Sequence, residues 1–165
     1  MRSKTCTMLV LAISLAGCAA QQQKAVTVQP AKAPHVFKPL EFEYDPGAPP
    51  ALNFSRQLAL PAWQCDLEAT TGNTAVRYGD RRAIAEYSDS LMQCFKHSKA
   101  QGDEAVTRLK AAKVSERQSE LSKDLYAKWS AYLSGMTPYA TTDQRAKAAY
   151  TAAKKALETE VKFSN

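Results

Sequence analysis

The sequence predicts an all-α protein: a small bundle of three or four helices, preceded by a disordered or extended Pro-rich tether. Six of the eight prolines lie within residues 19–50, and this density of proline excludes a regular helix there. From residue 51 onward Ala, Leu, Lys, Glu and Gln dominate, and apolar residues recur three or four positions apart. No long alternating run of β-branched residues follows, which favours helices over a mixed fold. The helical domain is therefore assigned to residues 51–165.

The tether contains a segment, residues 36–47, that is more apolar than a spacer requires. Three apolar residues in it, Leu40, Phe42 and Tyr44, alternate with glutamates, which predicts a strand-like segment with one apolar face. Prolines on both sides restrict it to the edge of a sheet. One interpretation places the apolar face against the protein's own helices, and the other makes it a motif that docks on a partner. The candidate partner-binding residues here are Phe37, Leu40, Phe42 and Tyr44.

The first helix is expected from about Phe54 to Thr70, with Thr71-Gly72-Asn73 as its stop signal. Pro61 either kinks this helix or begins it. One side carries the apolar stripe Leu58, Ala62, Cys65 and Ala69, and the other side carries Leu60, Trp63 and Leu67.

The second helix is expected from an N-cap at Asp80 to about Lys99. Gly102 interrupts the pattern, and Asp103 is a candidate cap for a further helical stretch. The core-facing stripe of the second helix consists of Ile84, Tyr87, Leu91 and Phe95.

Two more helices follow. Ser115 fits an N-cap with Gln118 three residues later, or it lies within a helix, and Gly135 and Pro138 close this third segment. Residues 141–144 offer another cap for a last helix that reaches at least Val161. The aromatic row that includes Trp129 and Tyr132 either belongs to the core or lines a groove for a sugar or peptide, which makes both residues candidate partner-binding residues.

The amino terminus has the organisation of an export signal. Arg2 and Lys4 precede an apolar run over residues 8–16, which is too short to span a bilayer at ~20 residues per crossing. The run ends in Leu15-Ala16-Gly17-Cys18, which resembles the lipobox of bacterial lipoproteins. The alternative is an ordinary signal peptide in which the cysteine is incidental.

The resemblance to bacterial lipoproteins implies that residues 1–17 form a cleaved signal peptide and that Cys18 carries a covalent lipid. It also implies acylation of the new amino terminus, so that several chains together anchor the protein in a lipid bilayer. The residue that follows Cys18 is Ala19, whereas an aspartate at this position would resemble an inner-membrane retention signal. For a Gram-negative host, the resemblance therefore implies a location at the outer membrane, with the domain in the periplasm.

Cleavage before Cys18 removes Cys6, and lipidation uses Cys18, so that Cys65 and Cys94 remain of the four cysteines. An even remainder in an oxidising compartment predicts one disulfide between them. The alternatives are a redox pair, which would more closely resemble Cys-x-x-Cys, and a metal site, for which no further ligands stand at a recognisable spacing.

The sequence contains no motif of a known enzyme class, and neither of its histidines stands at a catalytic spacing. We expect no catalytic residues, no metal and no cofactor beyond the lipid on Cys18. His97 is interpreted as interacting with the dipole at the end of a helix. The formal charge of +6 falls to about +4 without Arg2 and Lys4, and such a mild excess argues against a nucleic-acid partner.

These observations favour a non-enzymatic lipoprotein of the cell envelope. Its tethered helical domain is expected to engage an envelope protein complex or the peptidoglycan cell wall. The alternative is a periplasmic or surface binding protein, one that captures a soluble ligand or inhibits a hydrolase.

Overall fold

The computed structural model describes residues 33–164, and within this range the chain forms an all-α fold of four helices with no strand. The helices are α1 (Pro50–Tyr78), α2 (Arg81–Ala111), α3 (Glu116–Ser134) and α4 (Gln144–Phe163). The predicted bundle is thus confirmed, and residues 33–49, the described part of the predicted tether, are extended before it. The predicted signal peptide and Cys18 lie outside the described residues.

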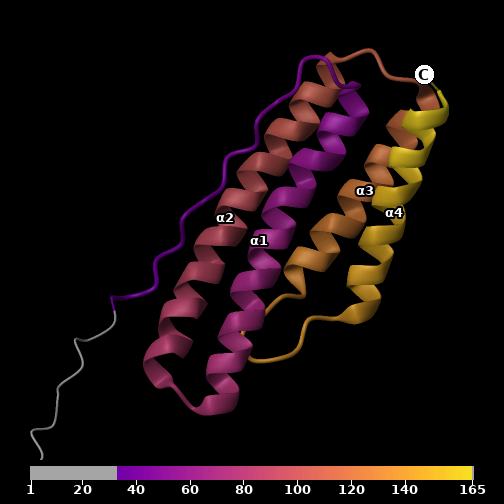
Figure 1. Ribbon diagram of the computed structural model, residues 1–165. Helices are drawn as coiled ribbons and strands as arrows, with labels where there is room; N and C mark the ends of the chain where they lie inside the picture. The colour runs from indigo at the N-terminus through magenta and orange to yellow at the C-terminus, as the bar shows by residue number, and fades with distance from the viewer. Residues whose placement is uncertain (1–32, 165) are drawn as a thin grey trace, which may run out of the picture. The chain divides into compact units, whose positions relative to one another are not determined.

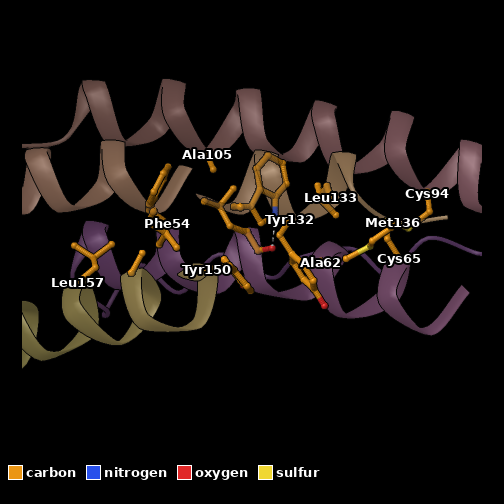
Figure 2. Close-up of a cluster of buried hydrophobic side chains, with 14 of the residues drawn as sticks. Phe54, Ala62, Cys65, Cys94, Ala105, Tyr132, Leu133, Met136, Tyr150 and Leu157 are labelled. Atoms are coloured by element: carbon orange, nitrogen blue, oxygen red, sulfur yellow. Dashed lines mark hydrogen bonds between the residues drawn. A yellow bond between two sulfur atoms is a disulfide. The ribbon is translucent and has the colours of Figure 1, made fainter. Parts of the chain in front are cut away.

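Helix α1 is the central helix of the bundle. It forms a hairpin with α2, while α3 and α4 form a second hairpin that packs on α1 (Figure 1). Leu58, Leu125 and Leu157 are fully buried where these helices meet. Figure 2 shows part of this core, with Phe54, Tyr132 and Leu157 labelled. Trp129 of α3 belongs to the same core and donates a hydrogen bond from Nε1 to the Leu58 carbonyl of α1 at 2.8 Å. A buried indole N–H that finds a partner fixes α3 in position as well as filling volume.

The predicted end of the first helix at Thr70 is wrong, because α1 continues to Tyr78. Gly72 does not stop the helix; its missing side chain makes room for Pro138, since a Cβ there would lie 2.7 Å from the Pro138 Cβ. The helix ends at Gly79, whose φ of 69° is in the left-handed region that glycine adopts without strain. The N–H groups of Gly79 and Asp80 return to the last turn of α1, which is a Schellman ending.

Pro61 lies inside α1, where it is fully buried, and it does not begin the helix.

Helix α2 begins at the predicted cap: the Asp80 carboxylate accepts a hydrogen bond from the Ala83 N–H at 3.0 Å. It then passes through Gly102 and Asp103 to Ala111, so the predicted end near Lys99 is wrong. Gly102 has a packing role, because a Cβ there would lie 2.6 Å from the Trp129 ring. Glycine inside a helix costs about 1 kcal/mol relative to alanine, and the close seat for the tryptophan offsets this cost.

The caps of the two later helices agree with the sequence. The Ser115 hydroxyl accepts a hydrogen bond from the Gln118 N–H at 3.1 Å at the start of α3. Asp143, within the predicted capping stretch, accepts hydrogen bonds from the first turn of α4. Gly135 follows the last residue of α3 with a right-handed φ of −87°.

The predicted disulfide between Cys65 and Cys94 is present. It joins α1 to α2 across a Cα–Cα distance of 5.6 Å, and both residues are fully buried. A covalent link in the middle of the hairpin restricts the unfolded chain, which stabilises a domain of this size. Among the described residues, no helix has the length and apolar character needed to cross a membrane.

Candidate binding surfaces

Residues 33–49, called here the extended segment, lie along the α1–α2 hairpin (Figure 1). Gln64 of α1 binds the middle of the segment: it donates to the Lys38 carbonyl at 2.6 Å and accepts from the Leu40 N–H at 3.2 Å. Phe37 is buried, and the centre of its ring lies 6.1 Å from the centre of the His97 ring. The Gln64 side chain therefore pairs with backbone groups of the segment, as the backbone of a neighbouring strand would in a sheet.

The carboxyl end of the extended segment is also held. Asn53 of α1 donates to the Asp45 carbonyl at 2.7 Å, and its Oδ1 accepts from the Asp45 N–H at 3.3 Å. The guanidinium of Arg108 on α2 lies 5.1 Å from the centre of the Tyr44 ring, a cation–π contact. The segment is thus attached to both helices of the hairpin.

At the amino end of the extended segment, His35 joins a polar cluster. Its Nε2 lies 2.8 Å from the carboxylate of Glu68, which is only 7% exposed, and its ring stacks on Tyr87. Its backbone N–H donates to Glu86 at 2.9 Å. This hydrogen bond, together with one from Arg82, lowers the pKa of Glu86. Sequence reasoning missed this cluster, because its members are far apart in the chain.

The His35 cluster brings together a histidine, a glutamate and a serine, but not in the order of a catalytic triad. The Ser90 hydroxyl donates to Glu68 at 2.7 Å, and both residues converge on the same nitrogen of His35. In a triad the base receives the nucleophile's proton on one ring nitrogen, while the acid holds the other nitrogen. Ser90 is also buried. The geometry therefore matches a structural attachment.

His97 does not lie at the end of a helix, so its predicted interaction with a helix dipole is wrong. It stands in the middle of α2, which continues to Ala111. Its Nε2 is buried and has no hydrogen-bond partner among residues 33–164.

The predicted partner-binding residues fall into two groups. Trp129 and Tyr132 are 2% and 3% exposed, so the core interpretation is correct for them. Within the extended segment, Phe37 is buried and its ring lies next to His97 of α2, whereas Phe42 is half-buried. Leu40 and Tyr44 remain exposed at 45% and 42%. The described chain forms no strand there, so the predicted strand-like segment is wrong.

An exposed apolar stripe lies beside the extended segment. It consists of Trp63 and Leu67 on α1, which are 58% and 51% exposed. Leu40 is also exposed, and its backbone is bound by Gln64, the residue next to Trp63. Trp63 and Leu67 stand four residues apart, so their side chains meet on one side of the helix. The sequence contained this signal, because Trp63 and Leu67 fall outside the stripe that faces the core.

A polar cluster fixes α4 and the loop before it to α1. Asp66 of α1 accepts hydrogen bonds from Lys147 of α4 at 2.7 Å and from the Thr142 hydroxyl at 3.0 Å. Burial raises the pKa of Asp66, but these hydrogen bonds and the lysine charge outweigh burial and hold the pKa below 3.8. Burial and the negative charge of Asp66 raise the pKa of Tyr132.

No group of three or more His, Cys, Asp or Glu within residues 33–164 is arranged to hold a metal ion. No family model, curated protein or solved structure matches the chain. The function therefore has to be argued from the residues themselves.

Proposed function

We propose that the protein is a non-enzymatic lipoprotein of the outer membrane whose helical domain binds another envelope protein through the exposed apolar stripe. The observation that carries the proposal is the exposure of Trp63 and Leu67 together on α1. Neighbouring large apolar side chains left in water mark an interaction surface, and tryptophan is the residue type most enriched among energetic hot spots. An apolar stripe fits a protein surface better than a hydrated wall polymer.

The extended segment supports this arrangement because we place its exposed Leu40 in the same binding surface as the stripe. Gln64 holds the segment, so Leu40 is fixed beside α1 before a partner arrives. A surface that is already ordered loses less conformational entropy on binding than a flexible one. Because the segment is attached to the bundle, residues 19–32 would span at most about 50 Å between the proposed lipid and the domain.

The lipid anchor has its own test. Cys18→Ala is expected to release the protein from the membrane fraction, because the residue proposed to carry the lipid is gone. Cys6→Ala is the matched control, since this residue lies in the proposed leader, and it should leave the protein in the membrane fraction. Mass spectrometry of the mature protein should find an acylated Cys18 as its first residue. An unmodified cysteine in the membrane-bound protein would contradict the anchor.

The stripe is tested by native gel electrophoresis of detergent-solubilised membranes. The wild-type protein is expected to migrate in a complex larger than the monomer, and Trp63→Ser with Leu67→Ser should shift it to the monomer. Met92→Ser is the control, because Met92 is 68% exposed on α2, outside the stripe. A double variant that stays in the large complex would refute the proposed binding surface.

A further inference from the structure

A groove runs between α2 and α3. Both helices pack on α1 but make few backbone contacts with each other. The groove contains a hollow of about 550 Å³ with an apolar lining of Phe54 from α1 and Val106 and Leu109 from α2. This volume lies within the range of about 300 to 1,000 Å³ that is usual for small-molecule sites.

Tyr126 of α3 divides the groove. Its hydroxyl donates to Asp103 of α2 at 3.2 Å, so the side chain crosses from one wall to the other. A second hollow of about 350 Å³, next to Trp129, lies beyond it and is also lined by Tyr126. A partner helix, about 10 Å across, has no continuous path along a groove that is bridged in this way. The bridge favours a thin occupant, such as a single acyl chain.

The rim of the larger hollow is positively charged. Lys110 on α2 and Lys123 on α3 line it, and neither has an ion-pair partner among residues 33–164. The one acid in the lining, Asp103, accepts the hydrogen bond from Tyr126. Lysine stems extend an apolar wall while their ammonium groups stay at the water boundary. Apolar walls below two free cations complement an anionic head with an apolar tail.

We propose that this hollow binds one fatty acid. The tail lies on Phe54, Val106 and Leu109, and the carboxylate lies between the ammonium groups of Lys110 and Lys123. Tyr126 closes the far end and sets the length of chain that fits. The site shares no residue with the exposed apolar stripe, so this proposal does not depend on the proposed protein partner.

The head-group assignment is tested by calorimetric titration of the purified Cys18→Ala chain with laurate. We expect saturable binding of one laurate per chain, and at least tenfold weaker binding for Lys110→Gln with Lys123→Gln. The matched control, Lys96→Gln with Lys162→Gln, removes the same charge from exposed positions outside the groove and should stay within twofold of wild type. Dodecanol and dodecyltrimethylammonium, which lack the carboxylate, should bind at least tenfold more weakly.

Three results would overturn the proposal: no saturable binding of laurate, equal weakening by both lysine pairs, or equal affinity for laurate and dodecanol. All four lysines are exposed, so the variants should fold as wild type does, and thermal unfolding verifies this.

The role of Tyr126 is tested with saturated fatty acids of increasing length. Affinity should rise about fourfold per added methylene until the hollow is filled, and then level off. Tyr126→Ala joins the two hollows and should move the plateau to longer chains. Tyr78→Ala, at an 84% exposed position on α1, should leave the plateau unchanged. An unchanged plateau in folded Tyr126→Ala would show that the tyrosine does not limit the site.

Discussion

The two histidines of the chain have opposite surroundings. Nε2 of His35 lies 2.8 Å from the buried carboxylate of Glu68, whereas Nε2 of His97 is buried without a partner in the described chain. An unsatisfied buried polar group costs about 1–3 kcal/mol. His35 therefore gives the buried carboxylate of Glu68 a polar partner, whereas the unpaired Nε2 of His97 lowers the stability of the fold.

We expect His35→Leu to lower the free energy of unfolding by about 1–3 kcal/mol, because it leaves Glu68 with fewer partners. His97→Leu should leave stability unchanged or raise it by up to about 1 kcal/mol, because it removes the unsatisfied nitrogen. Urea unfolding of both variants beside wild type measures the two values. A larger loss for His97→Leu than for His35→Leu would contradict these assignments.

Gly102 is the second residue whose role depends on one neighbour. A Cβ would lie 2.6 Å from the Trp129 ring, so Gly102→Ala should displace the ring, strain its hydrogen bond to Leu58 and cost about 1–3 kcal/mol. Gly135→Ala is the control: the nearest atoms lie 3.7 Å away and φ is right-handed, so it should be neutral or slightly stabilising. Thermal unfolding compares the two. Equal effects would show that the close contact with Trp129 is unimportant.

At the level of the helices, the sequence predicted where a helix begins more accurately than where it ends. Asp80, Ser115 and Asp143 cap their helices because a cap needs only its own side chain and the next turn. Gly72 and Gly102 were interpreted as interruptions, although each permits close packing inside a helix. Glycine has both uses, and the choice depends on Pro138 and Trp129, which lie far along the chain. No local pattern contains that information.

The contact between α1 and α4 should depend on pH. The folded pKa of Asp66 is held below its ordinary value of 3.8, so its ionised form stabilises the fold. This contribution is fully present above pH 3.8 and is lost as the pH falls through the lowered folded pKa. The difference in unfolding free energy between wild type and Asp66→Asn should therefore be largest at neutral pH and shrink in acid. A difference that grows in acid would contradict the lowered pKa.

At the scale of the whole molecule, the sequence predicted the helical bundle and the disulfide. It left open whether Trp129 belongs to the core or lines a groove. It also left open whether the apolar segment before the bundle packs on its own helices, because the partners that decide the matter lie on two different helices. Gln64 and Glu68 of α1 and Ser90 of α2 bind the extended segment. Only the assembled hairpin brings them together. The exposed stripe was visible in the sequence as apolar residues outside the core pattern.

The fold supports the proposed function because it leaves two large apolar side chains exposed beside one another. The bundle buries Trp129, yet it leaves Trp63 exposed next to Leu67 and near the fixed Leu40. Anchoring at Cys18 would confine this surface to the membrane, where a partner is encountered in two dimensions.

The most direct measurement places a photo-reactive amino acid at residue 67 in intact cells, with the still more exposed residue 92 as the control. We expect a covalent adduct with one envelope protein from residue 67, no such adduct from residue 92, and loss of the adduct when Trp63→Ser is added. Mass spectrometry identifies the captured protein and the cross-linked peptide. No adduct from residue 67, or the same adduct from both positions, would contradict the proposal that the stripe is the binding surface.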